Sequence, residues 1–363
     1  MKNLHWKQAA LAIGVAVLVA SCGGGGAEGP GNRAGVKTLV AFGDSLSDIG
    51  SYRVGTIAGL ASLTGGAGRW TVNAPTGGQI WTERIAAIMG LPAPCSAETG
   101  LLPNQSGITG EAVTAHAGCT SYAQGSARVS SPVAPSSVAL QAAGKQNIGL
   151  MAKPVTAQVA AHLASHNGSF ASTELVTVLA GANDIFMELQ LTAPTNPTAA
   201  VTNVAAAAVT LANLIKTEMV AKGAKQVLVL NLPDIASTPF GMSEPAPVRA
   251  LLDTMVQTFN AKLAEGLTGV QGVRLGNAYA ENKDQFTNPA QYGLSNVTSV
   301  ACGPNALSNP AGTNGTSLVC NASNAVAGDI SHYFFADSVH PTPYGHELLS
   351  QFASRELSRA GWL

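Results

Sequence analysis

The sequence predicts an α/β protein with a parallel sheet covered by helices on both faces. Apolar runs typical of buried strands recur along the chain, and they end directly in turn residues such as Gly, Asn or Asp. Between these runs lie longer segments whose apolar residues have helical spacing. Strands buried on both faces are nearly continuous in apolar residues, and their alternation with helices is typical of parallel sheets. Hydrophobic residues make up 46% of the 363 residues, so the chain can form a large core.

The expected elements can be bounded in chain order. The first apolar run reaches Gly43 where a strand would stop, and the next two end in Gly181 and Pro233. Pro92 ends the first long helical pattern, and Gly223 has the place of a C-cap after another. We therefore expect strands at residues 37–43, 174–180, 226–232 and 273–275, and helices at residues 79–91, 154–166, 198–222, 245–267 and 343–361.

Two loop-rich insertions interrupt this alternation, at residues 92–152 and 287–331. Residues 51–78, rich in Gly, Thr and Ala, are expected to form a long loop or a short helix over the sheet. No internal repeat is visible, and the only convincing linker lies near the N-terminus. We therefore expect one domain over residues 36–363.

Residues 1–22 are expected to be a signal peptide and not part of the fold. Lys2 and Lys7 form a positive region, an apolar run follows, and small residues precede Cys22. The end resembles a bacterial lipobox, in which the cysteine is lipidated; an ordinary signal peptide that happens to end near a cysteine is the alternative. Residues 23–35 read as a flexible linker. Either way the protein is exported, as an outer-membrane-anchored lipoprotein or otherwise as a periplasmic or secreted protein.

The four remaining cysteines are an even number, which suggests disulfides in an exported chain. They allow three connectivities, of which local pairing, Cys95 with Cys119 and Cys302 with Cys320, is the simplest. A metal site is the alternative, but no Cys-x-x-Cys and no paired histidine spacing accompanies these cysteines. We therefore expect disulfides, and no metal site or cofactor.

Polar residues at strand ends and in late loops supply the parts of an activated serine. A serine hydroxyl is a poor nucleophile at its free pKa and needs an adjacent base. Asp337 and His340, three residues apart, can place a carboxylate against imidazole Nδ1, which leaves Nε2 to take the proton of Ser45. The backbone N–H groups of Ser45 and Gly125 and the side-chain amide of Asn183 are donors of the type that stabilises a tetrahedral oxyanion.

With these blocks in this order, the sequence resembles the GDSL family of lipases and esterases, also called SGNH hydrolases. The resemblance runs from about residue 38 to the C-terminus. It implies Ser45 as nucleophile, His340 as general acid/base, Asp337 as its orienting carboxylate, and Gly125 and Asn183 as oxyanion donors. It also implies a flavodoxin-like three-layer α/β/α sandwich, which agrees with the alternation above. The blocks are Phe42-Gly43-Asp44-Ser45-Leu46-Ser47-Asp48, Gly125, Gly181-Ala182-Asn183-Asp184 and Asp337-Ser338-Val339-His340-Pro341.

Neighbouring residues are given supporting roles. Asp44 is expected to cap or turn the backbone next to Ser45, and Asp48 and Asp184 to hold backbone rather than react. Core packing is the better expectation for Trp81, although it could line an acyl pocket together with Trp70 and residues 185–187. Five other histidines have no matching partner spacing and are expected to be surface or structural residues: His116, His162, His166, His332 and His346.

The expected function is a serine carboxylic-ester hydrolase that works through an acyl-enzyme on an ester or lipid substrate. The alternatives are a phospholipase, lysophospholipase or acyltransferase, a polysaccharide deacetylase, and a non-catalytic surface-binding lipoprotein. The net charge of −1, without clustered Lys and Arg, gives no indication of a nucleic-acid partner. Membrane contact is expected only through the N-terminal lipid anchor.

Overall fold

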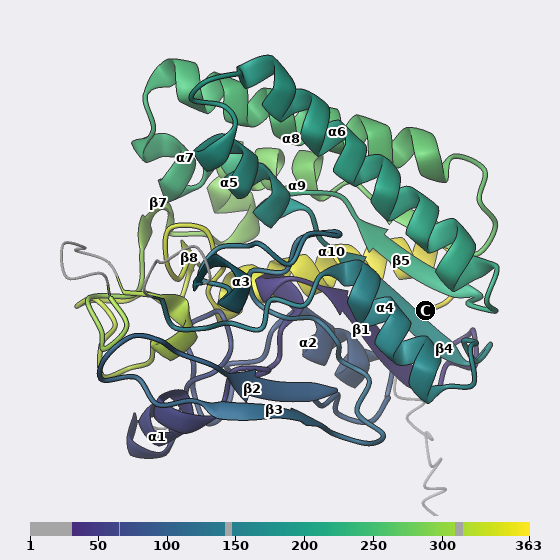
Figure 1. Cartoon of the computed structure of the whole chain (residues 1–363), viewed down its shortest axis with the longest axis horizontal. Helices are drawn as coiled ribbons and strands as arrows, with labels where there is room; N and C mark the ends of the chain where they lie inside the picture. Colours follow the sequence, from purple (N-terminus) through teal and green to yellow (C-terminus); the bar gives the residue numbers. More distant parts are fainter. Residues whose placement is uncertain (1–30, 65, 142–146, 309–314) are drawn as a thin grey trace, which may run out of the picture.

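A parallel four-stranded sheet forms the centre of the molecule (Figure 1). The computed structural model describes residues 31–64, 66–141, 147–308 and 315–363. The strands are β1 (Thr38–Gly43), β4 (Glu174–Leu179), β5 (Gln226–Leu230) and β6 (Val273–Gly276), in the order β1-β4-β5-β6. Their register pairs Gly43 with Leu179, so the carboxyl ends of β1 and β4 lie at the same edge.

Helices cover both faces of the sheet. Each strand presents apolar side chains to both faces, and these side chains pack against the helices. Val40, Phe42 and Val178 face one layer, and Leu39 and Leu179 face the other. The first layer contains α4 (Val155–Ser165), α5 (Ala182–Leu191), α6 (Pro197–Leu214) and α8 (Ala246–Leu267). The second contains α2 (Trp81–Ile88), α9 (Ala278–Thr287) and α10 (Pro343–Arg359). The prediction of a parallel sheet flanked by helices is confirmed.

The long helix that we expected at residues 198–222 changes character before its end. After α6, residues Ile215–Val220 form a π-helical segment, and Gly223 follows with a φ of 109°. By length and composition alone, the segment Pro197–Val220 could cross a bilayer. It packs instead along α8, as Figure 1 shows, with Val204, Ala208 and Leu211 buried in the core. We therefore assign it to the core of the domain.

The segments expected to be irregular contain short elements. Residues 51–78 include α1 (Gly55–Thr64), which settles the choice between a loop and a short helix there. The first insertion contains an antiparallel pair, β2 (Glu98–Leu101) and β3 (Glu111–Ala115), and the short α3 (Val138–Gln141). Near the second insertion, β7 (Asn296–Val300) pairs in parallel with β8 (Tyr333–Phe335). A further short helix, α7 (Pro239–Ser243), lies between β5 and α8.

Each insertion is closed by its own disulfide. Cys95 is bonded to Cys119 and Cys302 to Cys320, with Cα–Cα distances of 4.9 and 5.8 Å. The expected local pairing is thus confirmed. Both cysteines of the second bond are fully buried and pack against Ala336.

The predicted signal peptide, with its lipobox and Cys22, lies outside the described residues. The last residues of the predicted linker contact the folded domain. The backbone N–H groups of Arg33 and Ala34 donate to the carbonyl oxygen of Trp362 at 3.2 and 3.4 Å. The chain thus joins the fold beside its own C-terminal end, just before β1.

Removing either disulfide should lower the free energy of unfolding by about 3 kcal/mol, because each closes a loop of moderate length in the unfolded chain. The variants are Cys95→Ala with Cys119→Ala, and Cys302→Ala with Cys320→Ala. Urea unfolding of the oxidised wild type beside both variants measures the change. A midpoint equal to that of the wild type would contradict the contribution of that bond.

Candidate active site

The turn after β1 holds Ser45 at the carboxyl edge of the sheet. Gly43 has a φ of 146°, and a Cβ there would lie 2.0 Å from the carbonyl oxygen of Leu179, so only glycine fits this close approach. The side-chain amide of Gln158 binds both the N–H and the C=O of Gly43, at 2.9 and 2.8 Å. Asp44 then caps the short 3₁₀ turn that contains Ser45 by accepting the N–H of Leu46 at 3.1 Å.

The structure brings Ser45, His340 and Asp337 together from the two ends of the chain. Nε2 of His340 lies 2.8 Å from Oγ of Ser45, and Nδ1 lies 2.8 Å from Oδ1 of Asp337. The carboxylate accepts, so Nδ1 carries the proton and Nε2 is left as the acceptor that faces the serine hydroxyl. The indole of Trp70 packs against the imidazole, with ring centroids 4.9 Å apart.

The carboxylate of Asp337 is buried but well supplied with donors. It accepts the N–H of Ser317 at 2.9 Å and the N–H of His340 at 2.9 Å in addition to the imidazole. Burial alone would raise the pKa of Asp337, but the charge and hydrogen bond of His340 and the N–H of Ser317 together lower it below the ordinary value. This carboxyl group is therefore ionised at neutral pH.

A chain segment beside β1 brings further donors toward Ser45. Residues 120–124 run along the edge of β1, where the N–H of Tyr122 donates to Ala41 and the N–H of Gln124 donates to Gly43. The structure places the next residue, Gly125, against Trp70: a Cβ at Gly125 would lie 2.5 Å from the indole ring. The requirement for glycine here is therefore one of packing.

The N–H of Gly125 is already occupied, because it donates to Oδ2 of Asp48 at 2.8 Å. Its neighbour Ser126 has a φ of 67° and lines the cavity at Ser45, and its N–H makes no hydrogen bond to the described residues. The same holds for the N–H of Ser45. Of these two neighbouring residues, Ser126 rather than Gly125 thus has a backbone N–H without a partner among the described residues.

Asn183 lies at the start of α5 and faces the same cavity. Its Nδ2 donates to the carbonyl oxygen of Ala127 at 3.1 Å, which leaves a second N–H on the amide. The adjacent Asp184 points elsewhere: it accepts from Nε of Arg128 at 3.0 Å and from the N–H of Val129 at 2.9 Å. As expected, Asp184 binds a backbone group, the N–H of Val129.

Asp48 is a buried acceptor that joins several segments. Its carboxylate accepts the N–H groups of Gly50 and Ser51, the hydroxyl of Ser51 and the N–H of Gly125, with Nε1 of Trp70 at 3.4 Å. Burial raises its pKa, while these donors oppose the shift. Asp48 was expected to bind backbone groups, but the sequence could not predict its distant partners, Gly125 and Trp70.

A cavity of about 1150 Å³ opens at Ser45 and His340. Of the candidate acyl-pocket residues, Trp70 and Phe186 line it, whereas Trp81, Ile185 and Met187 are fully buried in the core. The preference for Trp81 as a core residue is confirmed. Much of the remaining wall is apolar and comes from α5 and the residues just after it, from α7 and α8, and from the turn after β5: Leu189, Ala193, Ile235, Phe240, Val248 and Leu251.

None of the other histidines in the described part of the chain lines this cavity. His116 and His332 are exposed, His166 is half-buried, and His162 and His346 are fully buried. Sequence reasoning missed Gln158, Ser126 and the wall of the cavity. Gln158 is a polar residue on the apolar face of a helix. This position is the one signal in the sequence that could have indicated that its side chain is buried and hydrogen-bonded.

Asp44→Asn should stabilise the folded chain at alkaline pH. Burial raises the pKa of Asp44 from 3.8 to about 7, against the Leu46 N–H and the charge of His340, which lower it. Since the folded pKa is the higher one, the stability that this group contributes is full below about pH 4 and is lost as the pH rises through about 7.

Asparagine can still accept the N–H of Leu46 but has no charge to bury. The free energy of unfolding of Asp44→Asn, measured with urea relative to that of the wild type, should therefore increase by on the order of 2 kcal/mol between pH 5 and pH 8. An advantage that stays constant or shrinks over this range would contradict the raised pKa.

Comparison with known proteins agrees with this geometry. Residues 39–352 match the family model described as GDSL-like Lipase/Acylhydrolase. The Arabidopsis thaliana protein GDSL esterase/lipase At1g06990 is 26% identical over 194 residues, 50% of this chain and 52% of that protein. GDSL esterase/lipase APG, also from Arabidopsis thaliana, is 28% identical over 145 residues, 37% of this chain and 39% of that protein.

In these alignments the chain spans about half the length of the relative or less. The family match, in contrast, extends over most of the chain, from β1 to within α10. It includes each of the blocks that carry Ser45, Ser126, Asn183 and His340. A match of this extent supports an ester-hydrolysing enzyme, and the chain belongs to the GDSL-like lipase/acylhydrolase family.

Proposed function

We propose that the chain is a serine carboxylic-ester hydrolase in which Ser45, His340 and Asp337 act as a catalytic triad. The observation that carries the proposal is the 2.8 Å contact between Oγ of Ser45 and Nε2 of His340, two residues that line a cavity large enough for an ester. A base within hydrogen-bond reach, itself oriented by a carboxylate, is what a serine nucleophile requires.

The reaction follows from these contacts. Oγ of Ser45 attacks the ester carbonyl carbon while Nε2 of His340 takes its proton, and the ionised Asp337 stabilises the imidazolium. The tetrahedral intermediate collapses when His340 gives this proton to the leaving alcohol, which leaves an acyl-enzyme. Water then attacks the acyl carbon with His340 as the base, and the second collapse releases the acid and restores Ser45.

Three donors are proposed for the oxyanion: the N–H groups of Ser45 and Ser126 and the amide of Asn183. The two backbone groups lack acceptors among the described residues, and Nδ2 of Asn183 has a second hydrogen to give. Such a donor contributes about 10²–10³ in rate when it is fixed before the reaction starts. Asp48 fixes the loop that carries Ser126, because it binds the preceding N–H of Gly125.

The apolar wall of the cavity indicates an ester with a hydrocarbon chain. Phe186 and Phe240 pack edge to face, with centroids 5.3 Å apart, and Leu189 and Leu251 continue this surface. At about 1150 Å³ the cavity is slightly larger than the usual range for small-molecule sites. We infer that a medium or long acyl chain lies along α5 and α8.

We also propose that the protein is exported. The two disulfides are compatible with an exported protein. Export through the signal peptide, with lipidation of Cys22 and anchoring in the outer membrane, is inferred from the sequence pattern at residues 1–22.

Ser45→Ala and His340→Ala should each lower kcat for p-nitrophenyl esters by about 10⁴–10⁶-fold. The double variant should be no slower than either single one, because the two groups act as one unit. A serine-reactive phosphonate should label the wild type and leave Ser45→Ala unmodified.

Circular dichroism of each variant controls for folding. Hydrolysis that persists in folded Ser45→Ala would overturn the proposal. A folded wild type that neither hydrolyses esters of any chain length nor takes the phosphonate label would instead indicate a binding protein. Acylated acceptor alcohol formed in place of free acid would indicate an acyltransferase.

Leu189→Trp should shorten the preferred acyl chain, because the larger side chain fills the cavity along α5. We expect about a tenfold loss of kcat/KM for the palmitoyl ester and little change for the acetyl ester. The matched control is Leu191→Trp on the same helix, since Leu191 is 54% exposed and does not line the cavity. Equal losses on both esters, or an equal effect of the control, would contradict this placement of the chain.

A further inference from the structure

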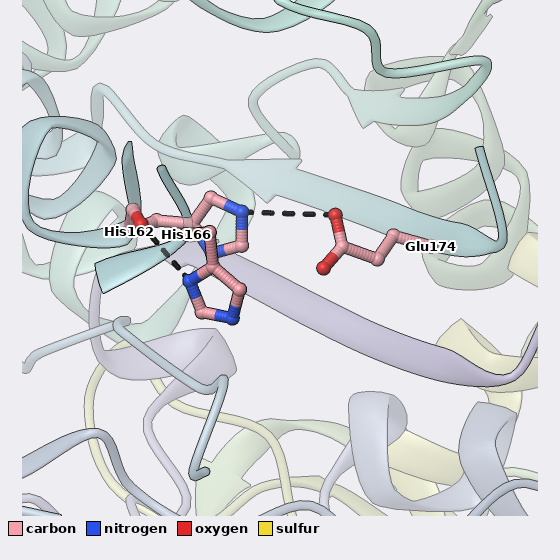
Figure 2. A group of neighbouring side chains, drawn as sticks. All are labelled: His162, His166 and Glu174. Atoms are coloured by element: carbon pink, nitrogen blue, oxygen red, sulfur yellow. Dashed lines mark hydrogen bonds and ion pairs between the residues drawn. The ribbon is translucent and has the colours of Figure 1, made fainter. Parts of the chain in front are cut away.

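A second group of chemically reactive side chains lies at the opposite end of the sheet from Ser45. His162 lies on α4, His166 is the residue that ends this helix, and Glu174 is the first residue of β4 (Figure 2). Each offers one ligand atom such that the three atoms lie within 4.8 Å of one another. Because a strand rises about 3.3 Å per residue, the group is roughly 16 Å from the active edge.

His162 is the unusual member of this group. Its side chain is fully buried, yet neither ring nitrogen makes a hydrogen bond to the described residues. Its ring lies between those of His166 and Phe170, with centroids 4.1 and 4.3 Å away, and the edge contacts of Phe42 and Tyr122 complete the enclosure. A buried polar atom without a partner costs about 1–3 kcal/mol. The two ring nitrogens of His162 therefore lack the partners that burial normally requires, and one of them could bind a ligand.

The bare nitrogen faces a carboxylate. Nε2 of His162 lies 3.6 Å from Oε2 of Glu174, as the dashed line in Figure 2 shows. This distance exceeds a hydrogen bond but suits two ligands of one small cation. With zinc–nitrogen and zinc–oxygen bonds of about 2.05 and 2.1 Å, an ion between these atoms would subtend an angle of roughly 120°.

We propose that His162, His166 and Glu174 form a zinc site. Two imidazoles and one carboxylate are a donor set that zinc accepts, and a water molecule would complete the tetrahedron. The N–H of Ala171 donates to the carboxylate of Glu174 at 2.9 Å and so positions it. The ion would join the end of α4 to the start of β4.

His166 can act as the third ligand through Nε2. Before any metal binds, its Nδ1 lies 2.9 Å from the carbonyl oxygen of His162, which places the proton on Nδ1 and leaves a free electron pair on Nε2. The two imidazole planes are inclined by only 14°, so the ring of His166 must turn to bring Nε2 to the ion. His166 is half-buried at a helix end, where such a rotation and the entry of an ion are both possible.

This proposal departs from the expectation that both histidines are surface or structural residues. Spacing by four residues places two histidines on one helix face, but the third ligand comes from a strand that begins eight residues later. The site has no contact with Ser45 or His340, so its proposed role is to stabilise the fold.

The test is a zinc titration of the untagged full-length protein after removal of metal with a chelator. We expect one zinc per chain by elemental analysis. Thermal unfolding should shift upward by about 4 °C when free zinc reaches 100 times its Kd. Mg²⁺ at the same concentration should leave the midpoint unchanged, because it prefers oxygen ligands.

His166→Gln and Glu174→Gln serve as the test variants, since neither opens a cavity in the core. Both should fold and bind zinc at least about tenfold more weakly. The matched control is His332→Gln, which removes an exposed histidine outside the group and should bind as the wild type does. The proposal is overturned if zinc produces no shift in the wild type, or if both test variants retain its stoichiometry and shift.

Discussion

The arrangement around Ser45 depends on the hydrogen bonds that the carboxylate of Asp48 accepts. A buried carboxylate is tolerated only when donors surround it, and Asp48 draws those donors from three separate parts of the chain. The N–H groups of Gly50 and Ser51 come from its own turn, that of Gly125 from the segment beside β1, and the indole of Trp70 from the loop after α1. The loop of Ser126 and the ring against His340 are thus held by one group.

The glycine at the end of β1 imposes a second constraint of the same kind. Because Gly43 has no Cβ, the turn can approach the carbonyl oxygen of Leu179, and β1 and β4 end side by side. Ser45 follows one of these strands and Asn183 the other. Their meeting across the sheet edge is therefore a consequence of parallel pairing and not of any direct bond between them.

Those parts of the site that depend on local geometry could be predicted from the sequence. Asp337 and His340 are three residues apart, and Ser45 and Asn183 directly follow apolar strands. The loop donor that we propose could not be placed, because the distinction between Gly125 and Ser126 depends on a positive φ at a serine and on a distant carboxylate. The wall of the cavity was equally hidden, since α5, α7 and α8 meet there only through tertiary packing.

Sequence separation gives the active site a further property. Ser45 and His340 are 295 residues apart, yet a single hydrogen bond of 2.8 Å joins them. Between them, Asn183 and Ser126 come from the middle of the chain. No fragment that folds alone can hold this constellation, because β1, β4 and the start of α10 must all be in place. The proposed ester hydrolysis therefore requires the whole domain to be assembled, and it should disappear with the first unfolding event that separates Ser45 from His340.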